Sequence, residues 1–189
     1  MDWYEAQAYC QWLGEVSGLP FALPTEAQWE YAARSRGQFL GFATQSGTVE
    51  IKSANRGVNV AGATDRTEFA EKHGLTSGFY TSLPGDTFPP NPLGVYDMTG
   101  NGYEWVHDWY DPNYYKVSPR KDPQGPDAPV HKNHKGAFTK VTRSVLNPVP
   151  FPYSTVTRTQ DAPDTTLLPD KTARCVVNQT TPVQLKGGS

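Results

Sequence analysis

Two carboxylates that bracket a glycine-rich turn are the first candidates for chemistry in this chain. Asp97 and Glu104 enclose a run that contains Gly100, Asn101 and Gly102. Hard cations such as calcium take about six to eight oxygen ligands, and glycines let a chain turn so that its carbonyls converge. The spacing therefore suits a calcium ion. It also suits a plain hairpin, because Asn-Gly is a strong turn signal, and the aromatic residues that follow would then be core.

Histidines are the next candidates. His131 and His134 have a spacing that could ligate zinc, copper or iron. The neighbouring lysines would repel a cation, which favours a solvated loop. His107 and Asp108 could form an acid–base pair, but adjacent residues of a strand face opposite sides. Polar packing at the edge of the core is therefore the favoured interpretation.

Cys10 and Cys175 lie near opposite ends of the chain and are its two cysteines. From the sequence they are either a disulfide that ties the termini together or two unrelated buried thiols. No Ser-His-Asp order, glycine-rich phosphate loop or zinc-type cysteine spacing is present. The usual signatures of hydrolases, nucleotide-binding proteins and zinc domains are therefore missing.

The composition indicates one loop-rich domain held by aromatic packing. The chain has 189 residues, of which 12% are aromatic, with 17 glycines and 17 prolines. That length is enough for a sizeable core. A formal net charge of -2 gives no electrostatic basis for binding nucleic acid or an anionic membrane. No apolar run approaches the roughly 20 residues of a membrane span, and no leader is visible at the start.

The N-terminal residues are predicted to form a helix that follows an Asp2 N-cap and runs to Val16. Tyr9, Trp12 and Leu13 fall with Val16 at helical spacing on one apolar face. A second helix is predicted over residues 23–36. In it, Thr25 and Gln28 form a capping box that satisfies free backbone amides at the helix start.

Beyond residue 37 the helical periodicity fades and glycines punctuate the chain. The region is predicted to contain loops, one short helical turn at 68–73, strands at 95–96, 103–109, 137–144, 155–159 and 173–177, and a flexible tail at 184–189. Two N-terminal helices followed by short antiparallel strands indicate the α+β fold class.

Long motifs occur in a fixed order along the chain. They read WYEAQAYCQWL, LPTEAQWEYAAR, FPPNPLGVYDMTGN, EW-x-x-DWYDPNYY and DPQGP. Together they resemble the formylglycine-generating-enzyme family, also called the sulfatase-modifying-factor family, from Trp3 to about Val177. The resemblance implies one domain over residues 1–189 with a variant of the C-type-lectin fold. It also implies that the family's usual upstream segment is missing.

The resemblance implies a calcium ion on the segment described first. The matching ligands are the side chains of Asp97 and Glu104 and the backbone carbonyls of Gly100 and Gly102.

A second and weaker family calcium site maps onto Asn55, Arg56 and Phe79, the last two through backbone oxygen. Ser77 stands where a ligand carboxylate is expected. Loss of that charge weakens binding of a hard dication.

The resemblance also gives the cysteines a role. Cys10 and Cys175 fall where vertebrate members have a structural disulfide between the first helix and the last strand. A disulfide implies an oxidising compartment. The expected location is therefore extracytoplasmic, meaning periplasmic, cell-surface or secreted.

Active family members oxidise a substrate cysteine with a cysteine pair that holds copper(I), a metal that thiolates select. By alignment, Lys140 and Val145 occupy those positions, and no cysteine lies from Gln11 to Arg174. The prediction is a non-catalytic binding or structural module with calcium and no copper. Arg158 resembles an arginine that the family keeps near its substrate groove. It is the predicted contact for an unidentified protein or small-molecule partner.

The alternative is a cysteine-independent oxidase, like the family branch that takes part in periplasmic pyoverdine maturation. The ergothioneine-synthesis branch binds iron through histidines of an additional N-terminal domain, which this chain lacks. Metal content separates the two readings, because an oxidase of this kind would hold a redox metal.

Overall fold

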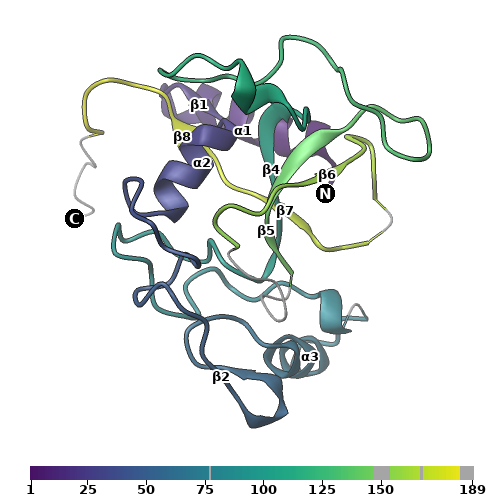
Figure 1. Ribbon diagram of the computed structural model, residues 1–189. Helices are drawn as coiled ribbons and strands as arrows, with labels where there is room; N and C mark the ends of the chain where they lie inside the picture. Colours follow the sequence, from purple (N-terminus) through teal and green to yellow (C-terminus); the bar gives the residue numbers. More distant parts are fainter. Residues whose placement is uncertain (77, 147–153, 167, 184–189) are drawn as a thin grey trace.

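The computed structural model describes all residues except 77, 147–153, 167 and 184–189, so the predicted tail and Ser77 lie outside the described residues. Figure 1 shows two helices, α1 and α2, at one end of the molecule and α3 with β2 at the other. The central sheet lies between them. None of the described helices is long and apolar enough to cross a membrane.

The central sheet has the strand order β6-β5-β4-β7. Its long strands are β4 (Gly102–Trp109) and β5 (Lys140–Val145), which pair antiparallel with Glu104 opposite Arg143. At one edge, β6 (Thr159–Asp161) continues antiparallel to β5. At the other edge, β7 (Lys171–Ala173) runs parallel to β4, which corrects the prediction of antiparallel strands alone. The chain between β6 and β7 crosses from one edge of the sheet to the other, as a parallel pair requires.

The remaining strands form two short pairs. β1 (Phe21–Ala22) pairs with β8 (Val176–Val177), and β2 (Ile51–Lys52) pairs with β3 (Arg56–Gly57). The strand predicted over 173–177 is therefore divided between two sheets, and residues 95–96 form no strand. Short 3-10 helices cover Ser53–Asn55, Gly78–Tyr80 and Tyr114–Lys116.

Helix α1 (Trp3–Ser17) begins at the predicted Asp2 N-cap, but its buried face differs from the predicted apolar face. Trp3, Ala6 and Cys10 are buried, whereas Tyr9 and Trp12 are each 52% exposed. Val16 is exposed as well. The reason is tertiary. The disulfide to Cys175 and the contact with Trp105 draw the side of the helix that carries Cys10 toward the core.

Helix α2 (Glu26–Ala33) confirms the Thr25–Gln28 capping box in both directions. It ends three residues before the predicted boundary, because Ser35 and Arg36 adopt the left-handed backbone region. Helix α3 (Ala63–Lys72) is a ten-residue helix where one turn was expected.

Strand β4 separates two clusters of buried apolar side chains. Val106 packs with Trp29 and Met98 in one cluster, and Trp105 packs with Trp3 and Cys10 in the other. Alternate residues of a strand face opposite sides. β4 therefore contributes side chains to the core on both of its faces.

Candidate functional site

The two predicted calcium carboxylates lie close together in the structure. Asp97 sits in a tight turn before β4 with a φ of 60°, and Glu104 projects from β4 itself. Both line one cleft of about 570 Å³. Gly102 has a φ of 146°, and a Cβ there would lie 3.0 Å from the Thr172 side chain, so the turn requires glycine.

Glu104 already has strong partners within the chain. Its Oε2 accepts hydrogen bonds from Trp29 Nε1 and from Arg174 Nε, both at 2.6 Å, and its Oε1 accepts one from Arg174 Nη2. The same guanidinium also donates to the carbonyl of Asp97 at 3.2 Å. Arg174 therefore ties the turn to the strand, and a cation on Glu104 would share the carboxylate with it.

Asp97 is less well compensated. Its Oδ2 accepts one hydrogen bond, from Asn101 Nδ2 at 2.6 Å. Burial raises the pKa of the Asp97 carboxyl to about 7, and the Glu104 charge adds to this rise, against the Asn101 hydrogen bond and the charges of Arg174 and Arg66. A carboxylate that is buried without a close cation suits a hard metal ion. Of the predicted calcium ligands, Asp97 therefore has the carboxylate that is more available to a cation, whereas Glu104 is already paired with Arg174. The calcium ion stays a prediction.

The residues of the second predicted site are arranged differently. The Phe79 carbonyl accepts a hydrogen bond from Arg66 Nε at 3.0 Å, and the Arg66 guanidinium lies over the Phe79 ring. Arg66 is fully buried. The Arg56 side chain pairs with Glu68, and the Asn55 backbone adopts the left-handed region. The Phe79 carbonyl is therefore already engaged by a guanidinium, and the second calcium site stays a prediction.

The predicted partner residue Arg158 belongs to a buried ion-pair network. Arg158 Nε and Nη2 donate to the two oxygens of Glu26 at 2.7 and 2.8 Å. Arg143 Nη1 donates to Glu26 Oε1 at 2.7 Å, and Arg143 Nη2 to Glu30 Oε2 at 3.0 Å. Glu26 and Arg143 are both fully buried. Sequence reasoning missed both of them, although an arginine inside the strand pattern at 140–145 was a usable signal.

The Arg158 guanidinium is enclosed on its remaining sides. It lies over the rings of Tyr110 and Tyr115, 5.0 and 5.1 Å from their centroids, and Nη1 donates to the Asp111 carbonyl at 3.1 Å. Arg158 thus packs against the Tyr115 ring, and Tyr115 is itself exposed at the surface. Its predicted role as a direct partner contact stays a prediction.

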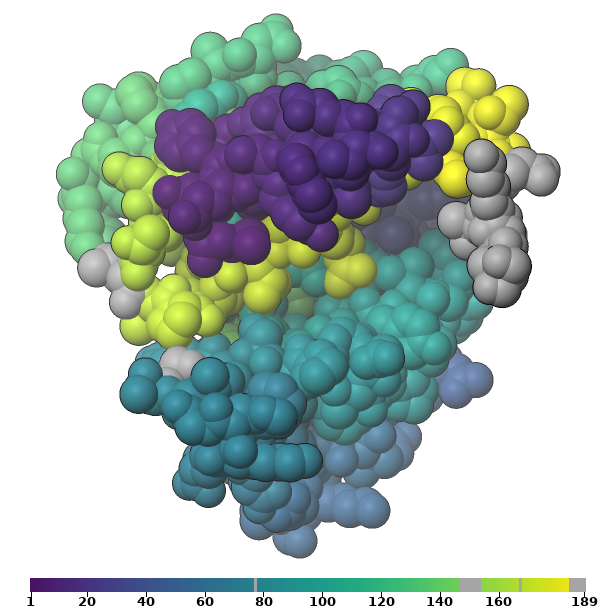
Figure 2. Space-filling view, turned by 180° about the vertical axis from the view of Figure 1, so that it is seen from behind, coloured from purple at the N-terminus to yellow at the C-terminus, as the bar shows by residue number. Residues whose placement is uncertain are grey.

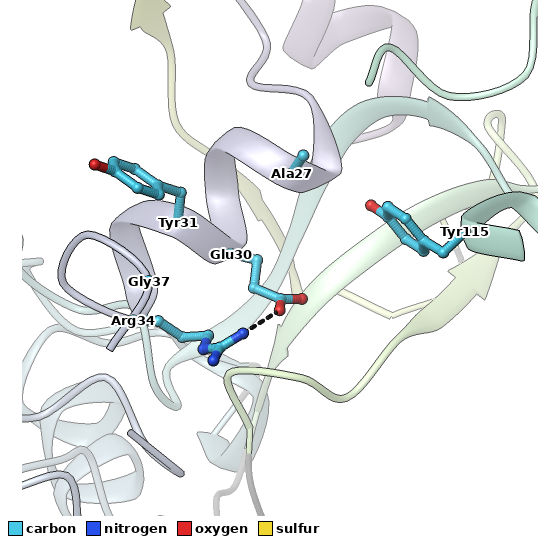
Figure 3. Close-up of a pocket in the computed structure, with 6 residues that line it drawn as sticks. All are labelled: Ala27, Glu30, Tyr31, Arg34, Gly37 and Tyr115. Carbon is cyan, nitrogen blue, oxygen red and sulfur yellow. Dashed lines mark hydrogen bonds and ion pairs between the residues drawn. The ribbon is translucent and has the colours of Figure 1, made fainter. Parts of the chain in front are cut away.

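A cleft of about 300 Å³ lies beside this network (Figure 3). Helix α2 supplies Ala27, Glu30 and Tyr31, and Arg34 follows at the end of the helix. Glu30 projects toward Tyr115, which stands across the cleft from α2. Arg34 Nη1 pairs with Glu30 Oε1 at 2.9 Å.

The predicted histidine candidates have different surroundings. His107 is exposed and Asp108 is buried on the opposite side of β4, as predicted. Asp108 Oδ2 accepts a hydrogen bond from Glu26 N at 2.7 Å, and burial raises the Asp108 pKa to about 6. His131 packs on the Tyr110 ring, and His134 is exposed. Across the described residues, no group of three or more His, Cys, Asp or Glu is arranged to hold a metal.

The cysteine alternatives are resolved by the structure. Cys10 and Cys175 form a disulfide, so both cysteines of the chain are bonded. The bond joins α1 to the short connection between β7 and β8, and Cys10 is fully buried. Figure 2 shows α1 across the face of the molecule, with the C-terminal residues coloured yellow beside one end of it.

Comparison with known proteins agrees with this architecture. Residues 1–187 match the family model for the sulfatase-modifying factor enzyme 1-like domain. The chain is 30% identical over 164 residues to the formylglycine-generating enzyme of Streptomyces coelicolor, covering 87% of this chain and 47% of that protein. It is 34% identical over 148 residues to the serine/threonine-protein kinase pkn1 of Chlamydia pneumoniae, covering 77% of this chain and 19% of that protein.

A solved structure gives the same result. PvdO from Pseudomonas aeruginosa superimposes with a TM-score of 0.56 at 26% identity, covering 87% of this chain and 55% of that one. The chain spans about half or less of the length of these relatives. With the mixed helices and short strands described above, these matches show that the chain belongs to the formylglycine-generating-enzyme (sulfatase-modifying-factor) family and has its C-type-lectin-like fold.

Proposed function

We propose that this domain is a non-catalytic binding or structural module that is stabilised by calcium and works outside the cytoplasm. The observation that carries the proposal is the disulfide between Cys10 and Cys175. Both cysteines of the chain are bonded to each other within the core. Thiolates select copper(I), and with both cysteines in a disulfide this chain offers no thiolate pair for copper-dependent oxidation.

The calcium part of the proposal rests on Asp97. Its carboxyl is half-buried beside Glu104 in the cleft, and in the described chain it accepts one hydrogen bond, from Asn101. Asp97 and Glu104, with the carbonyls of Gly100 and Gly102, would hold the ion. The ion would be a cationic partner for the Asp97 carboxylate, whose hydrogen-bond donor, Asn101, is neutral. Calcium is proposed at this position alone.

The location rests on the disulfide. Disulfides persist in oxidising compartments and are rare in the cytosol. The bond closes a sequence separation of 165 residues, a loop whose cross-link stabilises the fold by limiting the unfolded chain.

Metal analysis of the purified protein tests the proposal. We expect calcium at about one ion per chain, removable by a chelator, and copper below stoichiometric amounts. Stoichiometric copper that survives dialysis, or conversion of a cysteine-containing peptide into an aldehyde, would overturn it.

A second candidate is the cysteine-independent oxidase, and one observation favours it. His131 and His134 both line a cavity of about 560 Å³ together with Asp161 and Asp164. Imidazole and carboxylate ligands suit iron and copper(II). Stoichiometric iron or copper that is lost on substitution of His131 and His134 by alanine would favour this function over the first.

A further inference from the structure

We propose that the cleft between α2 and Tyr115 binds an aromatic carboxylate, either a small aromatic acid or the free C terminus of a peptide that ends in an aromatic residue. The inference rests on the proposed binding function and names a ligand class for it. The cleft that the proposal concerns is shown in Figure 3.

The walls of the cleft are aromatic and exposed. Tyr31 is 57% exposed and Tyr115 is 45% exposed, and both line the cleft. In Figure 3 the Tyr115 ring faces α2 across the cleft, and the Tyr31 ring lies on the other side of that helix. Large aromatic side chains contribute strongly to binding because they bring both apolar area and ring stacking. A cleft of about 300 Å³ is at the small end of ligand sites. Its size therefore suits one ring with a short substituent.

The charged floor of the cleft favours an anion. Both oxygens of Glu30 accept from guanidinium groups, one from Arg34 and the other from Arg143. Arg34 Nε donates to the Gln38 carbonyl and Nη1 to Glu30, while its Nη2 makes no hydrogen bond to the described part of the chain. The Glu30 charge is thus compensated, and Arg34 retains donors for a ligand carboxylate.

Tyr115 adds a second donor. Burial raises the pKa of the Tyr115 hydroxyl, and the charges of Glu26 and Asp108 raise it further. The hydroxyl therefore keeps its proton across the physiological range and is able to donate to an anion.

The ion-pair network below holds these groups in place. Arg158 lies against the Tyr115 ring, and Arg143 holds Glu30. Both arginines converge on the buried Glu26 carboxylate. A cleft whose walls are fixed before binding loses less conformational entropy when a ligand enters.

The test is a titration of the intact chain with N-acetylphenylalanine, followed by calorimetry and by chemical shifts of backbone amides. N-acetylphenylalaninamide, which lacks the charge, and N-acetylleucine, which lacks the ring, are the matched probes. We expect the acid to bind about tenfold more tightly than either, because a hydrogen bond to a charged group contributes more than a neutral one. The shifted amides should belong to α2 and to residues around Tyr115.

Variants assign the binding to the cleft. Arg34→Gln should remove the preference for acid over amide, and Tyr31→Ala should weaken binding of both probes about fivefold or more. Tyr9→Ala removes an equally exposed tyrosine on α1 and should leave binding unchanged. Thermal unfolding of each variant confirms that it is folded, and Arg34→Lys, which keeps the charge, should restore part of the preference.

Equal binding of acid and amide, a preference that survives in Arg34→Gln, or equal loss in Tyr9→Ala would overturn the inference. A longer peptide that ends in phenylalanine distinguishes the two sources, since tighter binding than N-acetylphenylalanine identifies a peptide C terminus and equal binding a small acid. Metal analysis is independent of these titrations. Absence of binding in a protein that holds calcium and no copper would therefore remove this inference and leave the proposed function intact.

Discussion

Two carboxylates in this domain, the buried Glu26 and the half-buried Asp97, have opposite surroundings. Glu26, at the start of α2, accepts three hydrogen bonds from the guanidinium groups of Arg143 and Arg158. Asp97, in the turn before β4, accepts one from a neutral asparagine, and burial raises its pKa. An acid that the chain compensates by itself is part of the structure, whereas an acid left uncompensated marks a place where an outside cation is expected.

The difference follows from what each nearby arginine already holds. Arg143 projects from β5 toward α2, where its guanidinium reaches both Glu26 and Glu30. Near Asp97, Arg174 is bound to Glu104, and Arg66 is bound to the carbonyls of Phe79 and Ala61.

The largest effect is expected where the compensation is complete. Arg143→Met should lower the free energy of unfolding by about 3–5 kcal/mol, because it removes a fully buried guanidinium that pairs with both Glu26 and Glu30. Urea denaturation measures the change. A loss below about 1 kcal/mol would contradict the claim that the network of Glu26, Arg143 and Arg158 stabilises the fold.

Asp108 is intermediate between these two carboxylates, because only one of its oxygens has a partner. Its Oδ2 accepts a hydrogen bond from the Glu26 amide, whereas Oδ1 is buried without a partner in the described chain. Its folded pKa of about 6 lies above the ordinary 3.8. Stability from this group is therefore complete below about pH 4 and is lost as the pH rises to about 6. The loss should reach at most about 3 kcal/mol.

Asp108→Asn should reduce the decline in stability that denaturation curves show from pH 4 to 7. The decline that remains is expected from Asp97, whose pKa burial raises to about 7. Asp164→Asn, at an exposed position, should retain the full decline. An unchanged pH dependence in Asp108→Asn would show that other groups produce it.

The environment of Asp97 is tested by the stabilisation that calcium gives to the native state. A calcium concentration of 100 times the dissociation constant should stabilise the native state by about 2.7 kcal/mol. Asp97→Asn should abolish the corresponding rise in melting temperature. Asp86→Asn, which changes an acid of the same cleft outside the predicted ligands, should keep most of it. Equal stabilisation of Asp97→Asn and the unmodified protein would remove calcium from this position.

The smallest effect is expected for an exposed ion pair. Arg56 and Glu68 pair at the surface, where both side chains are about half exposed. Water and salt screen such a pair. Arg56→Met should therefore leave the urea midpoint unchanged within error, and a clear shift would show that the pair belongs to a larger network.

Local features of the fold were predictable from the sequence. The Asp2 N-cap and the Thr25–Gln28 capping box are both present, because a capping box satisfies backbone amides within three residues of itself. The opposite orientation of His107 and Asp108 also follows from the strand period alone. The length of α3 was missed, since its composition is largely polar and gives a weak apolar pattern.

Long-range features were not predictable in the same way. The buried face of α1 contains Trp3, Ala6 and Cys10 rather than Tyr9 and Trp12, because the disulfide and Trp105 select it. Of the candidate site residues, Asp97 and Glu104 were found from their spacing. The partners of Glu104, namely Trp29 and Arg174, lie 75 and 70 residues away in the chain and carry no local signal.

The sequence by itself determined which chemistry is available. It contains two cysteines, a pair of carboxylates around two glycines, and the ordered motifs of the family. The tertiary structure alone decided how these groups are used. It bonded the cysteines to each other, gave Glu26 two arginines from distant strands and loops, and left Asp97 without one. The physical reason is that charge compensation depends on distances of a few ångströms, which the packing of remote segments sets.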